Sequence, residues 1–346
     1  MTMEHFIGQL AIPVQPEKMD KLDKKILYLL SLNCRLSNMA IARHLQTSRE
    51  VVSYRIQRMM EQEILHGFLT LINAQALAKK MIIVGIKVHA SVKIQELLEA
   101  FEKHPSVTAV RHCGGIFDVV MTIQANNDEE CYVVFHGFLE KYASAIKCHE
   151  IFSKLEQHFS SVYLLLDNND EKKKLEQIQE HKGNSFIRDF QTRPMSTIAS
   201  TDQQDQDILA ILNHDARISL ADLSAKTGIS FFQLQKRIKS LIRGNIIQAF
   251  IPYFSLVKCG FQCYYVFANV RQQAEPAFRE WTNQHPSIVW RTKLLGQFNY
   301  KLSLYVNNNS QLADILKEMH EQFGEAIFQT ESLPVFASSK YISFLK

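Results

Sequence analysis

The chain contains one long segment twice, and this repeat constrains its fold more than any other feature. A short block in its later part, Gly115-Ile116-Phe117-Asp118, recurs as Gly296-Gln297-Phe298-Asn299, 181 positions later. A duplicated segment of this length, in a chain of 346 residues, predicts two copies of a two-part unit rather than one core. The earlier part of the segment matches without a gap at a distance of 182 positions. The matching pairs are Asp23/Asp205, Ile26/Ile208, Leu27/Leu209, Leu30/Leu212, Arg35/Arg217, Ser37/Ser219, Ser48/Ser230, Arg55/Arg237, Ile56/Ile238 and Ile64/Ile246.

Composition excludes several classes of protein. A hydrophobic fraction of 46% is typical of a globular protein, and a formal charge of +4 permits contact with a polyanion without implying it. The six cysteines form no CxxC pair, so we expect free thiols, a cytoplasmic location, no metal and no cofactor. The first twenty residues lack the basic and then apolar pattern of a signal peptide, and no apolar run approaches the ~20 residues of a membrane span.

The front of each copy predicts three short helices. In the first copy these are residues 23–32, a helix capped by Ser37, and a third helix capped by Thr47 or Ser48. The second copy repeats the pattern with residues 205–212 and with caps at Ser219 and Ser230. Two helices, a tight turn and a further helix form a helix-turn-helix, whose last helix enters the major groove of DNA.

The third helix of each copy has an outward face that suits DNA. Arginine can bond guanine, glutamine can pair with adenine, and lysine, serine and tyrosine suit phosphate oxygens. The alternative is a solvated helix face, but the paired caps and the repetition favour DNA contact. The predicted DNA-binding residues are Arg49, Ser53, Tyr54, Arg55, Gln57 and Arg58 in the first copy, and Gln233, Gln235, Lys236 and Lys239 in the second.

Two features of these helices leave alternatives open. Phe231 and Phe232 stand where polar residues ordinarily meet DNA, so they either touch thymine methyl groups or bury against another domain. Arg55 and Arg237 occupy the same slot beside the buried stripe, and each either reaches phosphate or holds the three helices together.

The back of each copy alternates strand and helix patterns in the order βαββαβ. This order is typical of a ferredoxin-like sheet with helices on one face, and the uncovered face requires a second sheet, so we expect the two such domains to pair. The expected elements are 82–90, 94–104, 108–113, 119–123, 128–142 and 145–152, then 263–271, 274–284, 289–295, 300–306, 310–323 and 326–333.

Both copies resemble the Lrp/AsnC (feast/famine) family of transcription regulators, over about residues 20–165 and 203–346. The resemblance implies an α+β protein with two winged helix-turn-helix domains alternating with two ferredoxin-like sensor (RAM) domains. It also implies oligomers whose affinity for DNA changes when an amino acid or similar small effector binds near the loop between two sensor strands. The residues that carry it are the LDKKIL opening from Leu22, Cys34-Arg35-Leu36-Ser37, Ser48, Tyr54-Arg55-Ile56 and Gly115-Ile116-Phe117-Asp118.

The sensor loop also makes chemical sense for an amino acid ligand. Glycines expose backbone N–H groups that can hold a carboxylate, and the carboxylate of Asp118 can hold an ammonium group. The alternative is a tight turn in which Asp118 bonds nearby backbone. The second copy has Asn299 in place of this aspartate, which removes the charge partner. The predicted effector-binding residues are Gly114, Gly115, Ile116 and Asp118, with Gly296, Gln297 and Asn299 in the second copy.

The expected organisation is four small domains in one cytoplasmic chain. Its segments are an N-terminal arm (1–20), helix-turn-helix 1 (21–75), sensor 1 (80–166), a charge-dense linker (167–203), helix-turn-helix 2 (204–258) and sensor 2 (261–346). The sensor domains are expected to self-associate, either as a pseudo-dimer within one chain or as a homodimer. Tethered units with unlike recognition helices suit an asymmetric DNA site.

The leading prediction is a sequence-specific, DNA-binding transcription regulator that is not an enzyme. One alternative is a siroheme decarboxylase-like tetrapyrrole enzyme, which would need His and Arg to hold carboxylates. Arg111-His112 is a candidate for such a pair, although the second copy has Arg291-Thr292 and does not repeat it. The other alternative is a DNA-independent modulator that acts through mixed oligomers. The sequence contains no nucleophile triad, phosphate-binding glycine loop or metal-ligand motif.

Overall fold

The computed structural model describes residues 17–160, 162–166 and 200–341, and these form two compact units. One unit contains both helix-turn-helix segments, within residues 15–77 and 161–260, and the other contains both sensor segments, within 78–160 and 261–345. Each unit therefore combines parts from the two copies of the repeat. Most of the expected N-terminal arm and of the expected linker, 1–16 and 167–199, lies outside the described residues.

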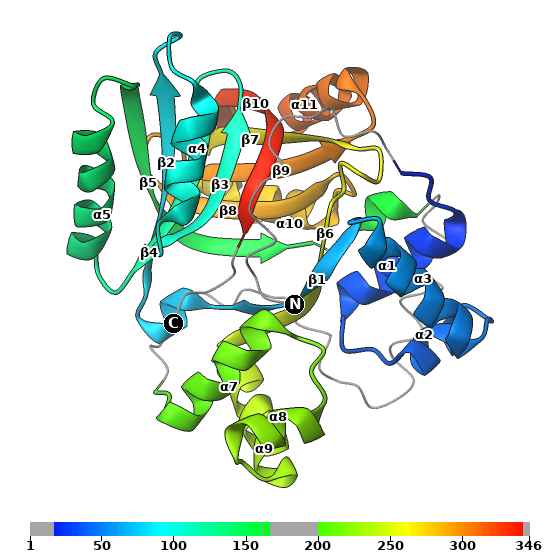
Figure 1. Ribbon diagram of the computed structural model, residues 1–346. Helices are drawn as coiled ribbons and strands as arrows, with labels where there is room; N and C mark the ends of the chain where they lie inside the picture. The colour runs from blue at the N-terminus through cyan, green and yellow to red at the C-terminus, as the bar shows by residue number, and fades with distance from the viewer. Residues whose placement is uncertain (1–16, 161, 167–199, 342–346) are drawn as a thin grey trace. The chain divides into compact units, whose positions relative to one another are not determined.

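The helix-turn-helix unit forms because local signals agree with the apolar pattern. Serine caps hold the second and third helices of each copy, and the expected stripes are buried, with Val52, Ile56 and Met59 in the first copy. The helices are α1 (Lys21–Leu32), α2 (Asn38–His44), α3 (Arg49–Glu61), α7 (Gln203–His214), α8 (Leu220–Thr227) and α9 (Phe231–Arg243), with a short 3-10 helix η3 (Tyr163–Leu165) beside α1 (Figure 1).

The strand that follows each three-helix segment pairs with its counterpart from the other copy. Strand β1 (Leu65–Ile72) runs antiparallel to β6 (Ile247–Phe254), with Leu69 opposite Ile251. The wing that the resemblance implied is thus a single two-stranded sheet that both segments share. Its physical cause is that each copy supplies one strand here, and an isolated strand must find a partner for its backbone groups.

The sensor unit is a closed barrel that the two copies build together. Its strand order is β10-β3-β4-β2-β5-β8-β9-β7, so each half has the ferredoxin-like order that the βαββαβ pattern predicted. The strands are β2 (Lys80–Val88), β3 (Val107–Cys113), β4 (Val119–Ala125), β5 (Ile146–Phe159), β7 (Gln262–Val270), β8 (Ile288–Leu295), β9 (Tyr300–Val306) and β10 (Ile327–Tyr341).

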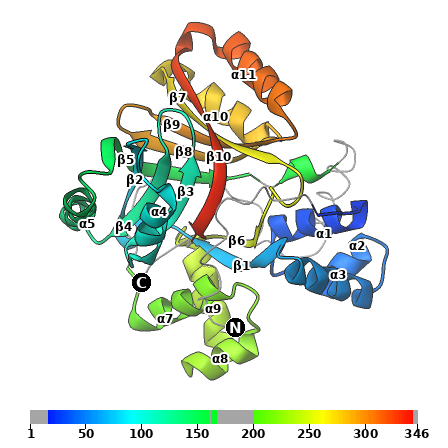
Figure 2. The same ribbon diagram turned by 45° about the horizontal axis from the view of Figure 1, so that its top comes forward.

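Helices cover the outer face of each half-sheet (Figure 2). Helices α4 (Ile94–Lys103) and α5 (Asp128–Lys141) pack on the first half, and α10 (Glu275–Gln284) and α11 (Asn309–Phe323) pack on the second. The inner faces of the two half-sheets meet in a separate aromatic core, where the rings of Phe117 and Phe267 lie 5.7 Å apart. The face that lacked a helical cover is therefore buried against the other copy, as expected.

The last strand of each copy is longer than expected and joins the two half-sheets. The first part of β5 pairs with β2 of its own copy, and the part from Ser153 to Phe159 pairs with β8 of the other copy. Strand β10 likewise pairs first with β7 and then, from Val335, with β3. Sequence patterns predicted that these strands end at residues 152 and 333, because the residues beyond find strand partners in the other copy.

Candidate DNA interface and sensor loop

The recognition helices expose most of the residues that were predicted to meet DNA. On α3, Arg49, Ser53 and Gln57 are exposed, and the Tyr54 side chain is 67% exposed. The amide of Gln57 bonds Glu61 within the helix. On α9, Gln235 is half-buried, whereas the others are exposed: Gln233, Lys236 and Lys239.

Arg55 and Arg58 are engaged inside the first helix-turn-helix instead. Both guanidinium groups bond Asp23, which is fully buried, at 2.8 and 2.5 Å. Asp23 and Asp20 form the capping box of α1, and Arg55 also reaches Asp20. A buried carboxylate needs such cationic partners. Contact of these two arginines with DNA stays a prediction, but their described role is to tie α3 to the start of α1.

The second copy repeats this clamp. Arg237 bonds Asp202 at 2.8 Å and Asp205 at 2.9 Å, and these two aspartates form the capping box of α7. Arg55 and Arg237, at matching positions, therefore tie the third helix of each copy to the start of its first helix. The matched arginines and aspartates are visible in the sequence, but their pairing with one another was not predicted from it.

A reciprocal pair of arginines locks the two helix-turn-helix segments to each other. Arg35 donates to the carbonyl oxygens of Ala216 (2.6 Å) and Ile218 (3.1 Å) in the other copy. Arg217 donates back to the carbonyl of Leu36 (3.1 Å) and to Asn38 Oδ1 (2.9 Å). Burial lowers the pKa of both guanidinium groups, so each carbonyl bond forms largely out of water.

Each of these arginines also stacks on an aromatic ring of the shared sheet. The guanidinium of Arg35 lies 5.3 Å from the ring centre of Phe250 on β6, and that of Arg217 lies 4.9 Å from Phe68 on β1. The two arginines thus make similar contacts: each bonds the backbone of the other segment and each stacks on a phenylalanine of the shared sheet. These contacts join the segment that carries α3 to the segment that carries α9 within one compact unit.

The sensor loop of the first copy has a structural network around Asp118. The Asp118 carboxylate accepts from Lys87 Nζ at 2.8 Å and from the backbone N–H of Val88 at 2.9 Å. The backbone N–H of Gly114 donates to the carbonyl of Pro334, in the other half of the barrel. Asp118 therefore bonds nearby backbone, as in the alternative that the sequence left open. Effector contact at Gly114, Gly115, Ile116 and Asp118 remains untested.

The second copy builds the same loop from neutral side chains. Asn299 Oδ1 accepts from the backbone N–H of Val270 at 2.9 Å, as Asp118 does from Val88. Asn269, at the position of Lys87, donates to the carbonyl of Gln297 at 2.6 Å. Gly296 has a φ of +157° and packs against Phe152, so the second loop also contacts the first copy.

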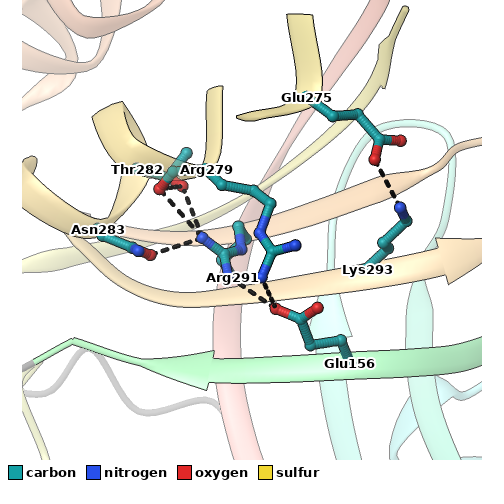
Figure 3. A network of polar contacts seen from close by, with 7 residues as sticks. All are labelled: Glu156, Glu275, Arg279, Thr282, Asn283, Arg291 and Lys293. Carbon is teal, nitrogen blue, oxygen red and sulfur yellow. Dashed lines mark hydrogen bonds and ion pairs between the residues drawn. The ribbon is translucent and has the colours of Figure 1, made fainter. Parts of the chain in front are cut away.

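An ion-pair network crosses between the copies on the helical side of the barrel (Figure 3). Glu156, from the extended part of β5, accepts from Arg291 at 2.8 Å and from Arg279 at 3.3 Å. Arg291 is only 2% exposed and also donates to Thr282 and Asn283 of α10. This arginine therefore has a structural role. Its partner was not predictable from the sequence, because Glu156 lies beyond the predicted end of the strand.

The pair Arg111-His112, considered for a tetrapyrrole site, lies on β3. The His112 ring contacts Phe336 edge to face at 5.3 Å, and partial burial lowers its pKa. In the part of the chain that the structure describes, no group of three or more His, Cys, Asp or Glu side chains is arranged to hold a metal ion. No helix among those residues is both long and apolar enough to cross a membrane.

Comparison with known proteins agrees with this architecture. Residues 19–60 and 202–242 each match the AsnC-type helix-turn-helix domain. A transcriptional regulator of Pyrococcus horikoshii is 28% identical over 118 residues, which cover 33% of this chain and 79% of that protein. The glutamate uptake regulatory protein of Zymomonas mobilis is 29% identical over 145 residues, or 39% of this chain and 88% of that protein.

Solved structures of similar fold include a siroheme decarboxylase. The siroheme decarboxylase NirDL superposes with a TM-score of 0.61 over 93% of both chains, at 10% sequence identity. At this identity the likeness concerns the fold alone. The doubled domain match shows that the chain carries the AsnC-type helix-turn-helix twice, in tandem, and the sequence relatives named here are regulatory proteins.

Proposed function

We propose that a single chain binds an asymmetric DNA site with both recognition helices and adjusts this binding to a small effector. The observation that carries the proposal is the reciprocal bonding of Arg35 and Arg217, which joins two helix-turn-helix segments into one body. Most regulators obtain such a pair by dimerisation. Here each half differs in sequence, so the two half-sites are expected to differ as well.

The proposed DNA contacts divide by chemistry. In the first copy, Arg49 suits a guanine edge, and Ser53, Tyr54 and Gln57 suit phosphates and bases. In the second, Gln233 and Gln235 suit adenine, and Lys236 and Lys239 suit phosphates. Arg58 and Arg55 contribute indirectly, by holding α3 in place through Asp23.

Binding is tested with a duplex selected by the wild-type protein from a random pool. Fluorescence anisotropy across a salt series should give a steep loss of affinity, because each phosphate contact releases counterions. The variant Lys236→Ala/Lys239→Ala should weaken binding and reduce the salt slope by about 2. A matched control is Lys317→Ala on α11, which is also exposed and should bind as wild type does. Absence of any enriched duplex would overturn the proposal.

The proposed effector is an amino acid or a similar small molecule at the first sensor loop. Lys87 already places an ammonium group against Asp118, so a ligand ammonium would compete with it for the same carboxylate. The second loop, with Asn269 and Asn299, offers no charge for this exchange. The Zymomonas relative is named for glutamate uptake, which makes acidic amino acids the first ligands to test. We expect the ligand to change the DNA affinity of the wild-type protein and of Asn299→Ala, but not that of Asp118→Asn.

A second candidate function follows from the NirDL fold match, which spans nearly the whole chain. A tetrapyrrole decarboxylase would release carbon dioxide from siroheme, and Arg111 and His112 are the residues closest to such chemistry. Incubation of the purified protein with siroheme, followed by mass spectrometry of the product, decides between the two candidates. We propose that no decarboxylated product forms and that the chain is not an enzyme.

A further inference from the structure

The second recognition helix begins with two exposed phenylalanines. Phe231 is 51% exposed and Phe232 is 77% exposed, and they are the first two residues of α9 after its cap, Ser230. An exposed pair of large apolar side chains is the kind of surface that marks a binding site. The corresponding positions on α3 hold Arg49 and Glu50, so this feature belongs to the second copy only.

The rest of the helix indicates what covers this pair. Lys236 and Lys239 follow Phe232 at spacings of four and seven residues, so all three lie on one helical face. Helix α9 also carries Arg237 and Arg243 and has no acidic residue. A cationic face beside an apolar tip fits a polyanion that also displays apolar groups, and it does not suit a purely apolar partner surface.

Duplex DNA meets both conditions in its major groove. The N-terminal residues of a recognition helix contact base edges, and the apolar group there is the C5-methyl of thymine. We infer that Phe231 and Phe232 read thymine methyl groups, so that the half-site of the second copy is specified by thymines. This inference rests on the proposed DNA binding and goes beyond it by naming the chemical group that is read.

The first copy has charged residues at the positions of the two phenylalanines. Arg49 and Glu50, at the tip of α3, can read polar base edges but have no use for a methyl group. One operator half is therefore read largely through hydrogen bonds and the other partly through apolar contact. Removal of thymine methyls should then affect only one half of the site.

Uracil interference tests this directly, because uracil pairs as thymine does but lacks the methyl. The duplex that wild-type protein selects from a random pool is prepared with sparse uracil, and bound and free fractions are mapped. Each methyl that the phenylalanines bury should contribute about fourfold in affinity, the equivalent of roughly 0.8 kcal/mol. The interfering positions should cluster in one half-site.

Variants assign the effect to the two side chains. Phe231→Ala/Phe232→Ala should bind more weakly and should no longer distinguish uracil from thymine. Lys236→Ala/Lys239→Ala should lose affinity equally for the thymine duplex and for the uracil duplex. Phe328→Ala is the matched control, since Phe328 is 63% exposed in the sensor unit, and it should retain the full uracil effect.

The outcomes separate the inference from the proposed function. Tight binding that uracil does not change, or a uracil effect that persists in the double phenylalanine variant, overturns the inference alone. A change in molecular mass of that variant, with no methyl dependence, overturns it in favour of a protein partner on this tip. Failure to enrich any duplex overturns DNA binding itself.

Discussion

Lys87 Nζ lies 2.8 Å from Asp118 Oδ1, and the second copy replaces both members of this pair by asparagines. Asn269 donates to a loop carbonyl, and Asn299 accepts from the backbone at the end of β7, so both bonds form without any charge. The two substitutions compensate each other, because either alone would leave an unpaired charge in a half-buried site. The two loops thus share similar hydrogen bonds, and of this pair of positions only the first copy has an ion pair.

This compensation predicts a double-mutant cycle. Asp118→Asn and Lys87→Asn should each destabilise the protein by about 1 kcal/mol, since each leaves its partner without an opposite charge. The double variant should recover part of that loss, because it recreates the pair of the second copy. Urea unfolding of the four proteins measures the coupling. Strictly additive losses would show that the two side chains do not depend on each other.

The cross-copy network predicts a larger effect. Glu156→Ala should lower the free energy of unfolding by about 3 kcal/mol or more, because it leaves the buried guanidinium of Arg291 without its carboxylate. Glu150→Ala, on the exposed part of the same strand, is the control and should change stability little. Equal stability of the two variants in denaturant unfolding would contradict a structural role for the network.

Sequence patterns predicted the parts of this fold that local signals determine. Ser37, Ser48, Ser219 and Ser230 were recognisable as helix caps, and all four accept a backbone N–H at the expected helix start. The βαββαβ order was predictable because each apolar strand alternates with an amphipathic helix. The pairing of the two sensor sheets followed from the apolar face that no helix covers.

Contacts between the copies were not predictable from the same patterns. The residues of β5 beyond Phe152 are mainly polar, and they form a strand only because β8 supplies its backbone partners. Arg35 and Arg217 were visible as a matched pair, but only the assembled unit shows that each bonds the other's copy. Arg58 looked like a DNA contact because its partner, Asp23, lies 35 residues away in the sequence.

A buried lysine in the barrel predicts an unusual pH dependence. Burial lowers the pKa of Lys301 to about 8, while the unfolded chain keeps a value near 10.4. Below pH 8 both states are protonated, so the folded state carries the full cost of the buried charge. Between about pH 8 and 10.4 the unfolded state binds more protons, so this residue's contribution to stability rises with pH.

Lys301→Met should therefore stabilise the protein at pH 7, and the advantage should shrink as the pH rises through this interval. The difference between variant and wild type is the quantity to measure, since buried phenols such as Tyr265 act in the opposite direction at high pH. Thermal unfolding at pH 7 and pH 9.5, with the exposed Lys317→Met as control, provides the check. A stability difference that does not change with pH would exclude Lys301 as its source.

The arginine lock predicts how the two recognition helices cooperate on DNA. Arg35→Ala removes the donor to the carbonyls of Ala216 and Ile218, so the two helix-turn-helix segments should lose their fixed spacing. Affinity for the selected duplex should fall by roughly tenfold or more, because the second contact no longer forms at a fixed effective concentration. Arg43→Ala, at an exposed position on α2, is the matched control.

Spacing separates this effect from simple loss of stability. Insertion of base pairs between the half-sites should sharply weaken wild-type binding, since a rigid pair of helices tolerates one separation only. The Arg35→Ala protein, checked for folding by circular dichroism, should respond much less to the insertion. Because Arg217 bonds the opposite copy in the same way, Arg217→Ala should reproduce the result. An Arg35→Ala protein that binds as tightly as wild type and keeps its sensitivity to spacing would show that the shared β1–β6 sheet alone fixes the pair.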